Sequence, residues 1–177
     1  MQTLSIEQVK EQIRAVPDFP KEGIIFRDIT TGIKNAQTMQ FMIDYLCDQF
    51  SDTKIDYIAG IESRGFIFGM PMAYKLKCGF IPIRKPNKLP AETISESYGL
   101  EYGTDTIEIH KDAIEKGANV LIVDDLLATG GTAVAACNLI KKCEGNLIGV
   151  AFLIELKDLH GREKLINCGK IVSMLQY

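Results

Sequence analysis

Short apolar runs recur along the chain after residue 56, and amphipathic stretches separate them. The runs are rich in β-branched residues, which predicts strands that are buried on both faces. They lie at residues 57–61, 80–83, 120–123, 147–154 and 171–175. Helices are expected between them at residues 65–76 and 133–142, with a short one near 162–166. This alternation predicts an α/β fold with a central, mainly parallel sheet flanked by helices.

The first fifty residues carry weaker signals. Ser5, with Gln8 three positions later, is typical of a capping box and predicts a helix that ends at Pro17. A loop then leads to a short apolar segment at residues 24–26. Asn35 is a candidate N-cap for a second helix with one apolar face.

The stretch from residue 84 to 103 is rich in charge, proline and glycine. Weak alternation of polar and apolar residues at 93–98 and 106–110 predicts a hairpin that stands off the body of the protein. Such a hairpin, from about residue 85 to 107, is a candidate mobile lid.

Composition narrows the class of protein. A chain of 177 residues is long enough for one domain with a full core. Its net charge of −3 argues against a nucleic-acid partner, and no apolar run has the length that a membrane span needs. The cysteines, five in all, form no CxxC pair, and neither His110 nor His160 has a second ligand nearby. Because no signal segment is evident, we expect a cytoplasmic protein with reduced thiols.

The segment from Val120 to Thr132 carries the strongest functional signal. A buried strand is closed by Asp124 and Asp125, and the loop Ala128-Thr129-Gly130-Gly131-Thr132 leads into a helix. Glycines let the backbone approach an anion, the helix N-terminus offers N–H groups, and threonine hydroxyls add donors. The loop is therefore predicted to bind a phosphate. The two carboxylates suit the groups beside it, either sugar hydroxyls or a hydrated Mg²⁺.

Other phosphate-binding loops fit less well. A P-loop would need a lysine after the glycines, and a dinucleotide fingerprint would need three spaced glycines, whereas only Gly130 and Gly131 are present. A buried strand with a polar end and a helix cap would explain the two acids, but not all thirteen residues together.

Two further segments lie at predicted strand ends. Glu62-Ser63-Arg64, with a glycine on each side, can bind an anion, and Arg64 can donate two hydrogen bonds to it. The basic cluster Arg84-Lys85-Pro86-Asn87-Lys88 follows another strand. Taken alone, the first is an ordinary turn and the second a solvated surface. Because the ends of parallel strands share one edge of a sheet, we expect the three segments to lie together at one anion-binding site.

These motifs resemble the type I phosphoribosyltransferases, which use 5-phosphoribosyl-1-pyrophosphate (PRPP), and among them the enzymes that act on adenine. The order and spacing of the matching pieces cover nearly the whole chain. They are residues 19–20 with 23–29, 56–60 with 62–66, 83–85 with 88–90, 100–103, 120–132, 155–156 and 161–165. One departure is Asn87, since many members have a glycine before the lysine that is Lys88 here.

The resemblance implies a role for each loop. In this family the two acids, here Asp124 and Asp125, bind the ribose hydroxyls, and the loop from Ala128 to Thr132 holds the 5′-phosphate. The second loop, Glu62-Ser63-Arg64, binds the pyrophosphate and often contains a cis peptide bond, here between Glu62 and Ser63. Basic side chains would neutralise the leaving pyrophosphate, and the candidates are Arg64, Arg84, Lys85 and Lys88.

The resemblance also implies the base site and the cofactor. Adenine would be bound by the backbone of Ile25 and Arg27, with Phe26 stacked on the ring. Glu101 would close over the purine as general acid or base, with Tyr102 beside it on the lid. The cofactor would be Mg²⁺, carried mainly by PRPP, with Asp124 or Asp125 as candidates for contact through water. A homodimer is expected from the family.

The expected reaction is purine salvage, in which adenine and PRPP give AMP and pyrophosphate. Enzymes for hypoxanthine or guanine have an aspartate where Ala128 stands, which counts against 6-oxopurines here. A phosphoribosyltransferase for xanthine or for hypoxanthine and guanine is the main alternative. A non-catalytic PRPP-binding regulator is a weaker one, because the basic cluster and Glu101 are both present.

Overall fold

The computed structural model describes residues 4–99 and 103–177. By its contacts the chain divides into two compact units, Met1–Tyr45 and Leu46–Tyr177. Each unit is described by itself. No helix in the described ranges is long and apolar enough to cross a membrane. The predicted assignment of a hood to about residues 1–35 with C-terminal elements, and of a lid to about 85–107, stays a prediction.

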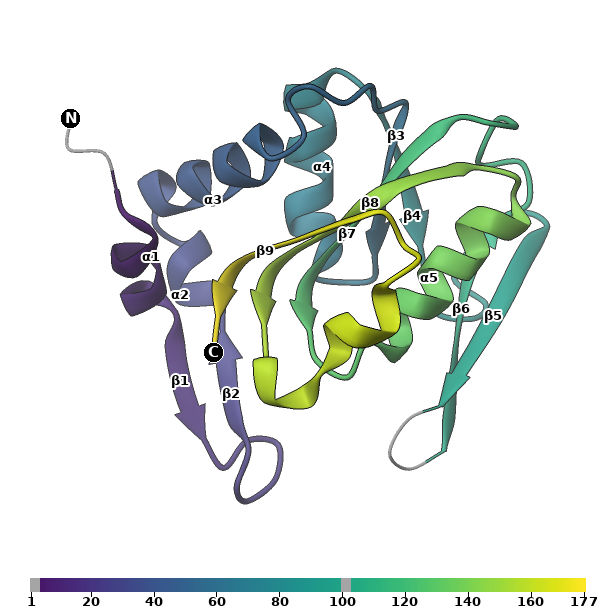
Figure 1. The fold of residues 1–177 in the computed structure, drawn as a ribbon. Helices are drawn as coiled ribbons and strands as arrows, with labels where there is room; N and C mark the ends of the chain where they lie inside the picture. The colour runs from purple at the N-terminus through teal and green to yellow at the C-terminus, as the bar shows by residue number, and fades with distance from the viewer. Residues whose placement is uncertain (1–3, 100–102) are drawn as a thin grey trace. The chain divides into compact units, whose positions relative to one another are not determined.

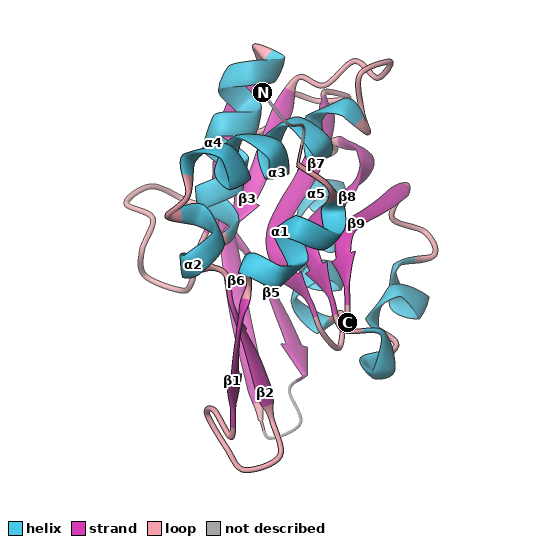
Figure 2. Ribbon diagram, turned by 90° about the vertical axis from the view of Figure 1, so that its left-hand side faces the viewer, coloured by secondary structure: helices cyan, strands magenta, loops and turns pink. Residues whose placement is uncertain are grey.

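The first unit opens on the predicted capping box. Ser5 Oγ accepts from the Gln8 N–H at 3.2 Å, and Gln8 Oε1 accepts from the Ser5 N–H at 2.8 Å. Helix α1 (Ile6–Gln12) stops well before Pro17, contrary to the prediction, because the backbone of Ile13 is already extended. The next residues form strand β1 (Arg14–Pro17), which pairs antiparallel with β2 (Ile25–Asp28), as Figure 2 shows.

Two helices follow β2. The short helix α2 (Thr30–Ile33) had no signal in the sequence pattern. Helix α3 (Ala36–Asp48) begins where expected, and Asn35 caps it, since Asn35 Oδ1 accepts from the N–H groups of Gln37 at 3.0 Å and Thr38 at 3.1 Å.

The second unit is built on a five-stranded sheet with the order β4-β3-β7-β8-β9 (Figure 1). All four strand pairs are parallel, which confirms the predicted fold class. The strands are β3 (Tyr57–Ile61), β4 (Gly79–Ile83), β7 (Asn119–Leu127), β8 (Asn146–Glu155) and β9 (Lys170–Gln176).

Helices cover both faces of this sheet. Helix α4 (Gly65–Leu76) connects β3 to β4, and α5 (Gly131–Lys142) connects β7 to β8. The two crossovers run in opposite directions along the sheet, and because such connections are right-handed, the helices lie on opposite faces (Figure 1). Two 3₁₀ turns, η1 (Lys157–Leu159) and η2 (Gly161–Leu165), link β8 to β9.

The central strand β7 is longer than the apolar run that predicted it. Residues 120 to 123 are fully buried, as expected of a strand covered on both faces. The strand does not close at the acidic pair: Asp124 pairs with Phe152 and Leu127 with Glu155, both on β8. The aspartates therefore lie within a hydrogen-bonded strand, because β8 extends beside them and continues the ladder.

The predicted hairpin consists of β5 (Thr93–Gly99) and β6 (Thr104–His110), paired antiparallel. Its base does not stand off the body of the unit. Ile107 is 1% exposed and Ile109 is fully buried, and the Arg84 and Glu108 backbones bridge the hairpin to the segment after β4. Polar side chains from α5 bind the other strand, where Asn138 Nδ2 donates to Glu96 Oε1 at 2.8 Å. Buried isoleucines hold this end of the hairpin in place.

Candidate active site

The carboxyl ends of β3 and β7 open on one cleft of about 340 Å³. The two strands are neighbours, and their crossovers leave in opposite directions, which makes this point the topological switch of the sheet, where ligands of open α/β folds bind. The lining comes from both strand ends, from the segment after β4 and from the hairpin: Ile61, Glu62, Ser63, Arg64, Lys85, Tyr98, Ile107, Asp124, Asp125 and Thr132. The structure thus brings together residues predicted from three separate segments.

The acidic pair lies at the floor of this cleft. Asp125 is only 5% exposed, and its Oδ2 pairs with Arg64 Nε at 2.7 Å. Its N–H donates to Asp124 Oδ1 at 2.8 Å. Burial and the neighbouring charge of Asp125 raise the pKa of Asp124 well above its ordinary value. Burial also raises the pKa of Asp125, although the Arg64 guanidinium partly offsets the effect.

The predicted 5′-phosphate loop forms a separate small hollow next to the cleft. Residues 126 to 133, together with Asp124, line about 70 Å³. Gly130 has φ +82°, a left-handed conformation that favours glycine, and α5 begins directly after it at Gly131. The first residues of α5, Gly131, Thr132 and Ala133, line the hollow, and the N–H groups of a first helical turn have no helical acceptor, as a phosphate site requires.

The second loop has the predicted cis peptide bond between Glu62 and Ser63. The Glu62 carboxylate is engaged with the basic cluster: it accepts from Arg84 Nε at 3.1 Å, from Arg84 Nη2 at 3.0 Å and from the Lys85 N–H at 3.0 Å. The hydrogen bonds from Arg84 lower the pKa of Glu62. A carboxylate held in this way positions Arg84, while the charge that can attract an anion comes from the cations around it.

Lys85 is also paired with a carboxylate. Its Nζ forms an ion pair with Asp105 on β6, and Tyr98 Oη donates to Asp105 Oδ2 at 3.1 Å. The bond from Lys85 lowers the pKa of Asp105. Lys88 contributes a backbone carbonyl, which accepts from Arg84 Nη1 at 3.1 Å.

Sequence reasoning missed Asp105 and Tyr98. Both belong to the hairpin, and they lie directly opposite each other in its antiparallel register. The signal that could have found them is the register of the hairpin. A hairpin that pairs Thr93 with His110 also places Tyr98 opposite Asp105.

The predicted adenine-binding residues lie in the other unit, on β2. One edge of this strand pairs with β1, and no third strand joins the sheet in the part of the chain that the structure describes. An open strand edge presents backbone N–H and C=O groups, which a base can use. Ile25 is 51% exposed, and the ring of Phe26 packs edge-on against Phe19 with centroids 5.2 Å apart.

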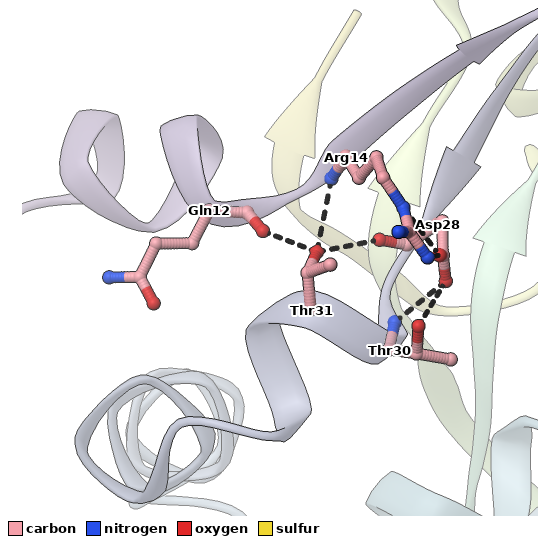
Figure 3. Close-up of polar contacts among 5 residues, drawn as sticks. All are labelled: Gln12, Arg14, Asp28, Thr30 and Thr31. Atoms are coloured by element: carbon pink, nitrogen blue, oxygen red, sulfur yellow. Dashed lines mark hydrogen bonds and ion pairs between the residues drawn. The ribbon is translucent and has the colours of Figure 1, made fainter.

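The end of β2 is fixed by a polar cluster (Figure 3). Asp28 Oδ1 accepts from the N–H of Thr30 at 2.9 Å and from its hydroxyl at 2.7 Å, and Arg14 pairs with the other carboxylate oxygen. These contacts, those of Thr30 first, lower the pKa of Asp28 to about 2. Thr31 Oγ1 links the same corner to α1 by donating to the Gln12 carbonyl at 2.6 Å.

The predicted general acid or base Glu101 and the lid residue Tyr102 lie outside the described residues.

Two loops at neighbouring strand ends around an acidic pair form the arrangement expected of a phosphoribosyl transferase, and the family model for the phosphoribosyl transferase domain matches residues 30–175. An adenine phosphoribosyltransferase from Trichodesmium erythraeum is 57% identical over 170 residues, which cover 96% of this chain and 99% of the relative. The chain therefore belongs to the adenine phosphoribosyltransferase family.

Solved structures of the same family are similar over nearly the full chain. Adenine phosphoribosyltransferase from Thermoanaerobacter pseudethanolicus has a TM-score of 0.95 at 50% identity and covers 98% of this chain and 100% of its own. The Saccharomyces cerevisiae enzyme, complexed with D-2,5-dideoxy-2,5-imino-altritol 1,6-bisphosphate and adenine, has a TM-score of 0.90 at 43% identity and covers 96% and 97%.

Proposed function

We propose that this protein transfers the 5-phosphoribosyl group of PRPP to adenine, giving AMP and pyrophosphate in purine salvage. The observation that carries the proposal is a pair of loops at adjacent strand ends, each with the glycines or donors that suit an anion, and two aspartates between them. PRPP has this arrangement of groups: a 5′-phosphate, a pyrophosphate, and ribose hydroxyls in the middle. Membership of the adenine phosphoribosyltransferase family supports adenine as the base.

PRPP would span the cleft and the hollow. The 5′-phosphate accepts hydrogen bonds from the loop of Ala128, Thr129, Gly130, Gly131 and Thr132 at the start of α5. The ribose hydroxyls donate to Asp124 and Asp125. The pyrophosphate lies against Ser63 and Arg64, with Arg84, Lys85 and Lys88 on its other side.

The ion pair between Arg64 and Asp125 indicates how the free site is kept ready. Its N···O distance of 2.7 Å holds both side chains at the cleft. Binding of PRPP would replace this pair with two others: hydroxyls would donate to Asp125, and Arg64 would donate to the pyrophosphate. The exchange keeps both charges partnered throughout.

In the reaction, the bond between C1 of the ribose and the pyrophosphate oxygen breaks, and a bond from C1 to N9 of adenine forms. Positive charge grows on the sugar while negative charge grows on the leaving pyrophosphate. Preorganised cations stabilise that charge more in this transition state than in the ground state. Arg64 is the closest of them to the acidic pair, and Glu101 would take the proton from N9.

Mg²⁺ fits this site as a partner of PRPP. No cluster of three or more carboxylate, imidazole or thiol groups suited to a metal occurs among residues 4–99 and 103–177. The phosphate oxygens of PRPP must therefore supply most ligands, and Asp124 or Asp125 would bind through water. When bound, the ion adds positive charge at the pyrophosphate. The two carboxylates are oxygen donors of the kind that Mg²⁺ prefers.

Adenine is proposed to bind along β2. A backbone carbonyl can accept from the 6-amino group, an N–H can donate to N1, and Phe26 can stack on the ring, with Ile25 and Arg27 supplying the backbone groups. Hypoxanthine presents the opposite polarity at both positions, and mispaired buried polar groups can cost about 10⁴ in selectivity. The protein is also proposed to be cytoplasmic and a homodimer, as its family is.

A panel of bases tests the function. Adenine, hypoxanthine, guanine, xanthine and orotate are each incubated with PRPP and Mg²⁺, and nucleotide and pyrophosphate are measured. Adenine should react fastest, and chelation of Mg²⁺ should abolish turnover. Faster turnover of hypoxanthine would refute the choice of base, and an absence of pyrophosphate with every base would favour a regulator that only binds PRPP.

A further inference from the structure

An ion pair outside the cleft stands directly behind the 5′-phosphate loop. Glu155, the last residue of β8, is 6% exposed. Its carboxylate accepts from Arg162 Nε at 2.9 Å and from Arg162 Nη2 at 2.6 Å. The same guanidinium donates to the Ile171 carbonyl at 3.2 Å and to Ser173 Oγ at 3.1 Å. Arg162 therefore fixes the turn η2 to both β8 and β9.

The residue next to Arg162 touches the phosphate loop. A Cβ built on Gly161 would lie 2.2 Å from the carbonyl oxygen of Ala128 and 2.9 Å from the nitrogen of Gly130. Reciprocally, a Cβ on Gly130 would lie 2.6 Å from the carbonyl oxygen of Gly161. The two backbones are in contact with no side chain between them, so a shift of η2 must shift the loop.

The opposite end of the loop is tied to the same strand. The Leu156 N–H donates to the Leu127 carbonyl at 2.9 Å, and Leu127 pairs with Glu155. The loop thus begins at a residue hydrogen-bonded to the end of β8 and then runs against Gly161. Arg162 joins these two supports, because it lies in η2 and its side chain is bound to Glu155 at the end of β8. Leu165 anchors the rest of η2, since it is fully buried in the core.

We propose that Glu155 and Arg162 are positioning residues for the 5′-phosphate loop, acting through Gly161. The ion pair holds η2 against the loop, so that the loop N–H groups stay aimed at the phosphate. This inference rests on the proposed function for the identity of the ligand. It assigns a role to two residues that contact neither substrate.

The test uses two probes that separate the two ends of PRPP. AMP reports on the 5′-phosphate loop, and pyrophosphate reports on the Ser63–Arg64 loop. In Arg162→Met the Kd for AMP should rise on the order of tenfold, because small misplacements of binding groups are costly. The Kd for pyrophosphate should change less than about twofold, since distant sites are nearly independent. Titration calorimetry measures both constants.

Further variants separate positioning from stability. Arg162→Lys keeps the charge but loses the forked geometry, so its Kd for AMP should lie between those of the wild type and Arg162→Met. Gly161→Ala pushes on the loop directly and should also weaken AMP selectively. Gly149→Ala is the matched control. Gly149 lies on β8, far along the strand from the loop, and its Cβ would lie 2.2 Å from the carbonyl oxygen of Lys170 on β9. It should lower the melting temperature and leave the Kd for AMP unchanged.

Two results would overturn the inference: equal losses of AMP and pyrophosphate affinity in Arg162→Met, or equal effects of Gly149→Ala and Gly161→Ala on the AMP Kd. Failure of the function itself looks different, since the wild type would then form no AMP from adenine and PRPP. In turnover assays with active wild type, Arg162→Met should raise the KM for PRPP more than it lowers kcat. A purely structural ion pair would lower the folded fraction, and so the apparent kcat, without changing KM.

Discussion

Replacing Asp124 with asparagine should stabilise the free protein and weaken PRPP binding. Asp124 lies beside a second carboxylate, in a place where burial disfavours its charge, which is why its pKa is raised. Asparagine has the same shape and keeps an oxygen that can accept from the Asp125 N–H, a bond of 2.8 Å in the wild type. The substitution therefore removes an unfavourable charge while retaining the local geometry.

The expected gain follows from this environment. Relieving a charge kept at a functional site commonly gives about 0.5–2 kcal/mol in free energy of unfolding. In a domain of this size each kcal/mol shifts the melting temperature by roughly 2–4 °C. Asp124→Asn should therefore melt a few degrees above the wild type at neutral pH without ligand. Asp125→Asn should gain less, because its charge is already compensated by Arg64 at 2.7 Å.

The pH dependence gives a sharper test. A carboxyl whose pKa is raised in the folded state destabilises that state once the pH exceeds the value in the unfolded chain, and the full cost is present above the folded pKa. As the pH falls through the raised pKa of Asp124, the wild type takes up a proton and the cost disappears. The difference in melting temperature between Asp124→Asn and the wild type should thus be larger at neutral pH than near pH 4, and it should shrink as the pH falls. Differential scanning calorimetry across this range measures it.

A melting temperature at or below that of the wild type at neutral pH would refute the reasoning. So would a gap that does not change with pH. The same variant should raise the KM for PRPP while leaving the Kd for adenine unchanged, because the side chain is assigned to ribose rather than to the base.

Three further outcomes are expected. Asp105→Asn should lower the Kd for pyrophosphate by up to about fivefold, as measured by calorimetry, because Lys85 loses a competing carboxylate; a weaker affinity would mean that Asp105 orients the lysine instead. Gly65→Ala should lower the free energy of unfolding, measured by chemical denaturation, by about 1–3 kcal/mol, and should also lower kcat/KM for PRPP. The reason is that its Cβ would lie 2.6 Å from the Val123 carbonyl oxygen, beside Asp124. Unchanged activity and stability would contradict the close packing of α4 on β7. Light scattering should give twice the mass of one 19.7 kDa chain, and a monomer would contradict the proposed dimer.

The central sheet was predictable because its signal is local. Strand β3 and helix α4 match their predicted ranges to the residue. In both, burial on the inside of an α/β layer leaves a continuous apolar run or a one-sided stripe. The capping box at Ser5 and the cap at Asn35 were found for the same reason, since each depends on residues within one turn.

What the sequence missed depends on pairing between distant segments. Strand β1 has four residues and no alternation, and it exists because β2 lies beside it in register. The extension of β7 past the aspartates exists because β8 continues next to it. The hairpin was expected to stand off the body of the protein, but its base is buried, because Ile107 and Ile109 show their burial only once α5 and β4 are in place. No local window contains this information.

The same contrast between local signals and long-range pairing applies to the candidate site. The loop from Ala128 to Thr132 could be predicted as a phosphate site because a glycine pair and a helix start lie in one segment, and the structure has that loop and that helix start. The ion pairs around the cleft were not predicted, since each joins residues from separate segments of the chain. Asp105 was missed entirely, and the sequence pattern did not predict that the carboxylate of Glu62 accepts hydrogen bonds from Arg84. Sequence motifs therefore predict the groups that would bind the ligand, and the structure adds the groups that pair with them in its absence.

That prior pairing bears on how the site works. Three cations predicted to bind pyrophosphate each have a carboxylate partner: Arg64 with Asp125, Arg84 with Glu62, and Lys85 with Asp105. A cleft with unpaired cations would bind pyrophosphate tightly but would release it slowly. With carboxylates in reach, each cation can pair with its carboxylate again as pyrophosphate leaves. This lowers the free-energy cost of separating pyrophosphate from the cations. If PRPP binds as proposed, the site exchanges one set of ion pairs for another, and its affinity reflects the difference between them rather than the full attraction of three cations.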